Sequence, residues 1–171
     1  MKAVPRRLLV LGGGSAGVEL AQVVRRLGGE VVVIEGAAHL LPREAAPLGE
    51  GLGEALRQDG IELVLGMRAS AARRDGQDYV LTFGDGSEQR GDRLLVATGR
   101  HPRVAGIGLE TVGVEASPGG IKVDEYLCAG ERLWAIGDVT GVWPLTHVGE
   151  YEGDVVAANI AGEARPADLC R

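Results

Sequence analysis

The chain has 171 residues, a formal net charge of −6 at pH 7 and 45% hydrophobic residues, so it is long enough for one domain, or for one domain and part of another. No run approaches the roughly 18 consecutive apolar residues that cross a membrane, and residues 1–7 are too few and too polar for a secretory signal. The acidic balance, without a basic cluster, argues against nucleic acid as a partner, because such binding depends on Lys and Arg neutralising phosphates. We therefore expect a cytoplasmic protein that contacts neither membrane nor nucleic acid.

The first part of the chain alternates between strand and helix signals. Residues 8–11 and 31–35 are short apolar runs typical of buried strands. Between them, residues 16–27 place apolar side chains at helical spacing and end at a pair of glycines. Strand, helix and strand form a βαβ unit, for which the parallel, right-handed crossover is the common form. A second helix at 47–58 and a strand at 61–65 continue the alternation.

The pattern changes in the middle of the chain. Residues 67–95 hold short alternating runs interrupted by two Asp-Gly dipeptides, which predict an antiparallel meander that ends in an apolar strand at 93–97. A stretch rich in glycine and proline at 99–118 indicates a domain boundary near residue 100. Beyond it the sequence predicts strands at 121–123 and 133–136, a loop at 137–144 and a helix at 146–160. The predicted fold class is α/β, with a Rossmann-like βαβ domain and an antiparallel β-meander.

Three glycines at fixed spacing follow the first predicted strand, as Gly12-x-Gly14-x-x-Gly17. In a dinucleotide site the first permits a tight turn, the second lets the backbone approach a pyrophosphate, and the third lets helix and strand pack closely. Ser15 and Ala16 then stand at the start of the helix, where N–H groups and a partial charge of about +0.5 favour phosphates. Glu35 follows Gly14 by 21 positions, close to the spacing of about 20 for an acid that binds the adenosine ribose.

Glu35 also bears on the choice between NAD and NADP. A 2′-phosphate about 4 Å from a carboxylate would cost roughly 4 kcal/mol per charge pair at an effective dielectric constant of about 20. Gly36 follows in place of an arginine that could bind the phosphate, although Arg43 would weaken the preference if it folded back. The sequence therefore favours NAD over NADP as the cofactor.

Several further segments resemble a known family. They are GGGSAGVELAQ (12–22), VVVIEGAAHLLPRE (31–44), LLVATGRHP (94–102), GIKVDEYL (120–127), LWAIGDVTG (133–141) and LTHVGEYEG (145–153). Together they resemble the FAD-dependent pyridine nucleotide–disulfide oxidoreductases, in particular dihydrolipoamide dehydrogenase and mercuric reductase. Many families share the glycine motif, whereas an ATG segment followed by IGD and then by THxxxxEG is far more specific.

The resemblance implies how the chain is divided. Residues 1–100 are expected to form the NAD-binding domain, and residues 101–171 the second, incomplete segment of an FAD-binding domain. In the first, Glu19 matches an acid near the nicotinamide, and Gly99 matches a glycine that passes close to the dinucleotide. The residues that match the FAD site are Gly137, which gives close approach, Asp138, which binds the ribitol, and Thr146 and His147 beside the flavin ring.

The same resemblance implies that the chain is a fragment. In the family, hydride passes from NAD(P)H to FAD and on to a disulfide or similar acceptor. This sequence has no first glycine-rich unit for FAD, no CxxxxC redox pair and no C-terminal dimerisation domain. We expect it to bind a dinucleotide, to contain no catalytic residues and to be inactive alone. Because the strand at 133–136 would lack sheet partners, we also expect self-association into a homo-oligomer.

Other side chains with reactive groups are assigned no role. Cys128 and Cys170 are far apart in sequence and are interpreted as ordinary thiols, so no metal site is expected. His39 and His101 lie in loop-like stretches and are expected at the surface.

Two other functions are compatible with the glycine motif. A non-catalytic module that binds NAD or another adenine nucleotide would need neither Asp138 nor His147, so their match to the flavin-side pattern argues against it. A methyltransferase that uses S-adenosylmethionine also has a glycine-rich loop and an acid after its second strand. Gly17 and the predicted meander favour the redox family over the methyltransferase.

Overall fold

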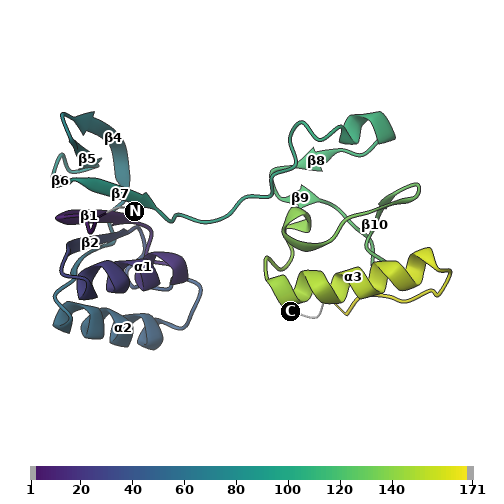
Figure 1. Cartoon of the computed structure of the whole chain (residues 1–171), viewed down its shortest axis with the longest axis horizontal. Coiled ribbons are helices and arrows are strands. Elements are labelled where there is room, and N and C mark those ends of the chain that lie inside the picture. The colour runs from purple at the N-terminus through teal and green to yellow at the C-terminus, as the bar shows by residue number, and fades with distance from the viewer. Residues whose placement is uncertain (1–2, 169–171) are drawn as a thin grey trace. The chain divides into compact units, whose positions relative to one another are not determined.

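The chain forms two compact units, the first ending at Gly99 and the second beginning at Arg100. The computed structural model describes residues 3–168, and Figure 1 shows the helices and strands of each unit. Within the described residues, no helix combines the length and the apolar character needed to cross a membrane.

The first unit is built on a four-stranded parallel sheet with the strand order β3-β2-β1-β7. Its elements, in chain order, are β1 (Arg7–Leu11), α1 (Ser15–Arg26), β2 (Glu30–Glu35), α2 (Ala46–Gln58), β3 (Glu62–Leu65), β4 (Ala69–Asp75), β5 (Asp78–Phe83), β6 (Glu88–Gly91) and β7 (Arg93–Val96). The predicted βαβ unit is confirmed, with the bounds from β1 to β3 within one residue of those expected. β2 and β7 flank β1 on opposite sides, and at such a reversal of strand order α/β sheets bind ligands beyond the carboxyl ends of their strands.

Both faces of the parallel sheet are covered, which explains its continuous apolar strands. One face packs against α1 and α2 through a cluster that includes Val10, Val24 and Leu56. The other face packs against β5 through a cluster that includes Leu9 and Phe83. Figure 1 shows the two helices on one side of β1 and β2 and the antiparallel strands on the other. Successive residues of β1 thus point into opposite layers.

The antiparallel meander is formed by β4, β5 and β6. β7 pairs in parallel with β1 instead, so the prediction that a strand at 93–97 ends the meander is wrong. The chain leaves the meander at Gly91, where a Cβ atom would lie 2.6 Å from the carbonyl oxygen of Arg7. Beyond this turn, Leu94 packs in the layer of β5 and Leu95 in the layer of the helices. Apolar contacts on both faces suit a parallel strand better than a strand of an open meander.

The second unit combines short antiparallel strands, 3₁₀ helices and α3. Its elements, in chain order, are the 3₁₀ helix Leu109–Val112, β8 (Ala116–Ser117), β9 (Gly120–Ile121), β10 (Cys128–Gly130), β11 (Leu133–Trp134), the 3₁₀ helix Gly137–Thr140 and α3 (Thr146–Ile160). β8 pairs with β9, and β10 pairs with β11. The helix predicted at 146–160 is confirmed.

Several predictions for the second unit are corrected. The strand expected at 121–123 is Gly120–Ile121, and the strand expected at 133–136 stops at Trp134. The partner of β11 is three residues long with an irregular register, so the ladder ends with it. The expected loop at 137–144 contains a 3₁₀ helix. β10 was not predicted, because Cys-Ala-Gly lacks the β-branched and aromatic residues that mark strands.

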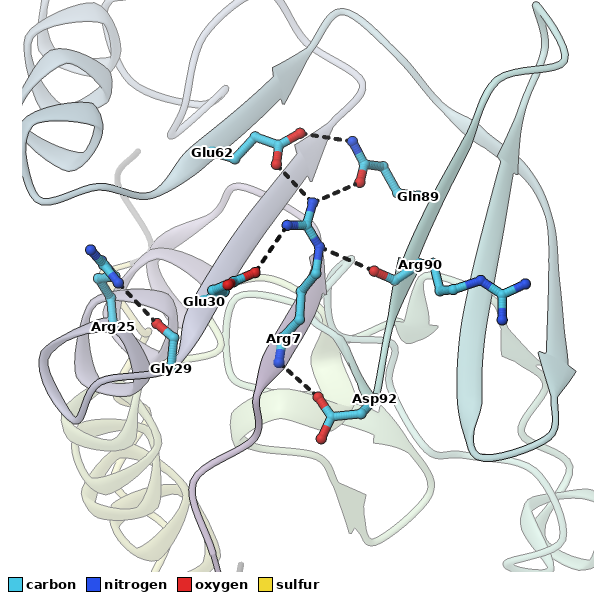
Figure 2. A network of polar contacts seen from close by, with 8 residues as sticks. All are labelled: Arg7, Arg25, Gly29, Glu30, Glu62, Gln89, Arg90 and Asp92. Carbon is cyan, nitrogen blue, oxygen red and sulfur yellow. Dashed lines mark hydrogen bonds and ion pairs between the residues drawn. The ribbon is translucent and has the colours of Figure 1, made fainter.

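The Arg7 side chain joins several strands at the amino end of the parallel sheet (Figure 2). Its guanidinium donates hydrogen bonds to Glu30 at 3.3 Å, to Glu62 at 2.8 Å and to the amide oxygen of Gln89 at 3.1 Å. Its Nε donates to a backbone carbonyl of β6 at 3.1 Å. The backbone N–H of Arg7 donates to the Asp92 carboxylate at 2.7 Å. These bonds connect β1 to β2, β3 and β6 at the end of the sheet opposite the glycine motif.

We expect Arg7→Ala to lower the free energy of unfolding by about 1–2 kcal/mol, because it removes several charge-assisted hydrogen bonds from one partly buried group. Urea unfolding followed by circular dichroism measures the change. Arg73→Ala is the control, because Arg73 pairs with Glu88 on the exposed meander, and such pairs contribute about 0–1 kcal/mol. Equal losses in the two variants would contradict the joining role of Arg7.

Candidate functional site

The turn after β1 is built from glycines that leave no room for side chains. The N–H of Gly12 donates to the carbonyl of Ile34 at 2.8 Å, which ties the turn to the end of β2. Gly12 has a φ of +113°, and a Cβ atom there would collide with the carbonyl oxygen of Ala97, just beyond β7. A Cβ atom at Gly17 would collide with the carbonyl oxygen of Gly12, so α1 packs directly on the turn. Packing within the unit therefore requires both of these glycines.

Gly14 differs from them, because neither its backbone nor its neighbours require a glycine. Its φ of −73° and ψ of 178° are open to other residues, and a Cβ atom there would meet no heavy atom within 4 Å. Gly14 is the N-cap of α1, and no side chain caps the helix. The next residues, Ser15 and Ala16, are exposed. The start of α1 thus presents backbone donors beside an open space.

The Glu35 carboxylate is fixed at the carboxyl end of β2, next to this turn. Its Oε2 accepts the N–H of Gly13 at 2.7 Å, and its Oε1 accepts the N–H of Ala37 at 2.9 Å. A carboxylate has about four acceptor positions, so about two stay open to a ligand. A Cβ atom at Gly13 would lie 2.8 Å from the side chain of Leu40, which gives this glycine a packing reason as well.

The other residues predicted in the first unit lie on adjoining segments. Glu19 is exposed on α1. Gly99 follows β7 with a φ of +136°, and a Cβ atom there would meet no heavy atom within 4 Å. Ala97 donates its N–H to the carbonyl of Leu11 at 2.8 Å, so the segment that leads to Gly99 runs beside the end of β1. The residues gathered at the glycine turn itself are Gly12, Gly14, Ser15, Ala16, Gly17 and Glu35.

The residues predicted in the second unit lie on two elements. Gly137 and Asp138 open the 3₁₀ helix, and Thr146 and His147 begin α3. Asp138, Thr146 and His147 are exposed. The Asp138 carboxylate lies 3.7 Å from the guanidinium of Arg100, which also donates to a backbone carbonyl shortly before α3. Gly137 has a φ of +71°, and no heavy atom lies within 4 Å of its Cβ position, so the space beside its Cα is open although its N–H and carbonyl are already bonded to Glu152 and Thr140.

Glu152 is a residue of this region that the sequence analysis missed. It lies on α3, is 1% exposed, and its Oε2 accepts the N–H of Gly137 at 2.6 Å. A Cβ atom at Gly149 would lie 3.5 Å from the Cα of Gly137, so α3 packs closely on the loop. Glu152 belongs to the THxxxxEG segment, but a glutamate on a helix is ordinarily exposed, so its burial has no signal in the sequence. The contact fixes the backbone immediately before Asp138.

The remaining histidines and cysteines have separate surroundings. His39, expected at the surface, is only partly exposed, with Nδ1 2.8 Å from the carbonyl oxygen of Leu40. His101 is exposed, as predicted. Cys128 is half-buried, whereas Cys170 lies outside the described residues. Within residues 3–168, no three His, Cys, Asp or Glu side chains gather as a metal site.

The sequence also matches a family model. The model, described as pyridine nucleotide-disulphide oxidoreductase, matches residues 1–153. The chain belongs to this family. The resemblance inferred from the motifs is therefore confirmed, and solved structures that are similar over the chain confirm the α/β fold class.

The curated bacterial relatives include proteins with two different names. Dihydrolipoyl dehydrogenase of Pseudomonas aeruginosa is 38% identical over 164 residues, with 95% of this chain and 35% of that protein covered. Mercuric reductase of Streptomyces lividans is 38% identical over 174 residues, with 98% of this chain and 36% of that protein covered. The chain spans about a third of the length of the curated relatives it matches.

Two solved structures extend the comparison to the fold. LpdA from Mycobacterium tuberculosis has a TM-score of 0.89 at 30% identity, with 98% of this chain and 37% of that one covered. The HOCl-induced flavoprotein disulfide reductase RclA from Escherichia coli has a TM-score of 0.89 at 28% identity, with 98% of this chain and 39% of that one covered.

In this member of the family, we expect Glu152→Ala to loosen the loop that carries Asp138. The partly buried N–H of Gly137 loses its acceptor and a cavity forms at the buried position of Glu152, which lowers the free energy of unfolding of the second unit by about 2–3 kcal/mol. Amide hydrogen exchange, measured by NMR at Gly137, should become faster. Glu152→Gln keeps an oxygen acceptor, so its free energy of unfolding should fall less than that of Glu152→Ala. Glu150→Ala, at an exposed position of α3, is the control. An unchanged exchange rate in Glu152→Ala would contradict the contact.

Proposed function

We propose that the first unit binds NAD(H), with the diphosphate on the N–H groups at the start of α1 and the adenosine ribose on Glu35. The observation that carries this proposal is the open space at Gly14, because packing accounts for Gly12, Gly13 and Gly17 and does not account for Gly14. A backbone without a side chain lets a phosphate approach the helix closely. The partial positive charge at the start of the helix favours an anion there. Membership of a pyridine nucleotide family supports the same assignment.

The Glu35 carboxylate is already oriented for binding the adenosine ribose. Two backbone N–H groups already orient its carboxylate, so little side-chain entropy is lost when a ligand binds. The open acceptor positions can take hydrogen bonds from both ribose hydroxyls, while the negative charge disfavours a 2′-phosphate. We therefore propose NAD as the preferred cofactor. Glu19 and Gly99 are assigned to the nicotinamide half by their match to the family pattern.

For the second unit, we propose a contribution to an FAD site. Gly137 leaves open space where a side chain would stand, and the exposed Asp138 follows it on a loop that Glu152 holds in place. These features fit the ribitol side of FAD, and Thr146 and His147 are assigned to the flavin ring by the family pattern. FAD, when bound, supplies the electron transfer between a reduced nicotinamide and a disulfide or similar acceptor. In this proposal the residues of this chain bind and orient the cofactors.

Gly14→Ala separates ligand binding from folding. We expect a free energy of unfolding within about 0.5 kcal/mol of the wild type, since the added methyl group meets no protein atom. We expect NADH affinity to fall at least about tenfold, because the methyl group occupies the space in front of the helix start. Calorimetric titration with NADH and urea unfolding measure the two quantities.

Gly17→Ala is the matched control for this test, because its Cβ atom would collide with the carbonyl oxygen of Gly12. It should lower the free energy of unfolding by about 2 kcal/mol or more. The NADH site would lie elsewhere if Gly14→Ala bound NADH as tightly as the wild type. The proposal also fails if the wild type gives no heat with NADH at millimolar concentration.

Glu35→Ala tests the position of the ribose. It should weaken NADH at least about tenfold, because hydrogen bonds to a charged group contribute roughly 1.5–3 kcal/mol, and it should weaken NADPH much less. Since Glu35 also holds the N–H of Gly13, Glu35→Gln isolates the effect of charge while an oxygen acceptor is kept. Glu44→Ala, at an exposed position, is the control. Equal weakening of both nucleotides by Glu35→Ala would count against the ribose assignment.

A further inference from the structure

The side chain of Arg68 covers Gly36, the residue that follows Glu35. A Cβ atom at Gly36 would lie 2.8 Å from Cγ and 3.0 Å from Nε of Arg68, and the three atoms nearest to that position all belong to this arginine. The Gly36 backbone is not in the left-handed region that favours glycine. The missing side chain at Gly36 therefore makes room for Arg68 and does not serve a turn.

Backbone contacts carry Arg68 to this place. Gly66 donates its N–H to the carbonyl of Ala37 at 2.8 Å, and Met67 donates to the carbonyl of Glu35 at 3.2 Å. The Met67 side chain packs in the layer between the parallel sheet and β5. The connection between β3 and β4 is thus tied to the carboxyl end of β2, and Arg68 is the next residue along it.

The guanidinium of Arg68 is exposed and, within residues 3–168, forms no hydrogen bond or ion pair. Arg7 and Arg90, in contrast, both pair with carboxylates. Glu35 forms no ion pair with Arg68, and its two oxygens accept backbone N–H groups. The carboxyl end of β2 therefore carries a negative group, Glu35, and next to it an unpaired positive group, Arg68, whose side chain covers Gly36.

We propose that Arg68 binds the 2′-phosphate of NADP(H), so that the site accepts NADPH as well as NADH. This inference rests on the proposed function, in which the adenosine ribose lies at Glu35. A guanidinium binds phosphate through charge-assisted hydrogen bonds, and here its donors are not already used. The attraction between Arg68 and the 2′-phosphate offsets the repulsion between this phosphate and Glu35. The preference for NADH over NADPH is therefore smaller than it would be with Glu35 alone.

Arg43, the arginine considered in the sequence analysis, does not take this place. It is exposed, and none of the three atoms nearest to the Cβ position of Gly36 belongs to it. The residue that discriminates between the nucleotides is thus reached through the β3–β4 connection and not through the loop after β2.

A role in stacking on the adenine ring would leave a different signature. NADH and NADPH share the adenine ring, so loss of a stacking contact weakens both to the same extent. Only the 2′-phosphate distinguishes the two nucleotides. Titration of each variant with both nucleotides therefore separates phosphate binding from adenine stacking.

The test is calorimetric titration of the wild type, Arg68→Met and Arg68→Lys with NADH and with NADPH. Arg68→Met keeps an aliphatic stem over Gly36 and removes the charge, so we expect NADPH to bind about tenfold more weakly and NADH less than about twofold more weakly. Arg68→Lys should retain part of the NADPH affinity. Added KCl should weaken NADPH more steeply in the wild type than in Arg68→Met, because the charge pair is exposed and therefore screened.

Arg43→Met is the matched control, because it makes the same change of charge at an exposed position and should leave the ratio of NADH to NADPH affinity unchanged. An unchanged ratio in Arg68→Met, or a wild type that binds NADH but not millimolar NADPH, overturns the role of Arg68 and leaves the proposed function standing. A wild type that binds neither nucleotide overturns the proposed function, and the role of Arg68 with it.

Discussion

The direct packing of α1 on the turn after β1 is the constraint on which the site of the first unit depends. Gly17 lets the helix rest on the carbonyl of Gly12, and Gly12 lets the turn rest on the carbonyl of Ala97. With both contacts made, α1 starts at the edge where β1, β2 and β7 end. A side chain at Gly12 or Gly17 would clash with one of these carbonyls and displace the start of the helix, and with it the donors beside Gly14. The geometry of the candidate site is therefore a consequence of backbone packing.

Each unit also uses a carboxylate to hold a glycine loop. Glu35 accepts the N–H of Gly13, and Glu152 accepts the N–H of Gly137. Such charge-assisted bonds are stronger than neutral ones, which suits loops whose backbone must keep a fixed position. The two carboxylates differ in burial, and so in whether they can also bind a ligand. Glu35 is half-buried and keeps acceptor positions for a ligand, whereas Glu152 is 1% exposed and can act only on the loop.

The sequence predicted the parallel part of the fold best, because strands covered on both faces are continuously apolar and the helices between them are amphipathic. The prediction from sequence was wrong where the partner of a strand lies far away along the chain. β7 joins β1 because Leu94 and Leu95 pack into opposite layers, a property that local alternation does not encode. Spacing alone predicted that Glu35 belongs with the glycine turn, and the structure places the two in contact. The contact of Arg68 with Gly36 and the burial of Glu152 were not predicted, since each depends on which segments the tertiary fold brings together.

The glycines near β1 and β2 separate the requirements of folding from those of a ligand. Gly12 and Gly17 are explained by contacts inside the unit, and Gly36 is explained by Arg68. Gly14 has no such explanation, and neither has the unpaired charge of Arg68 itself. An uncapped helix start leaves backbone donors without partners, and an exposed, unpaired arginine adds little to stability. Both features attract anions, and both are held at the edge that carries Glu35. The dinucleotide proposed for this edge carries more than one anionic group, so it would use both features.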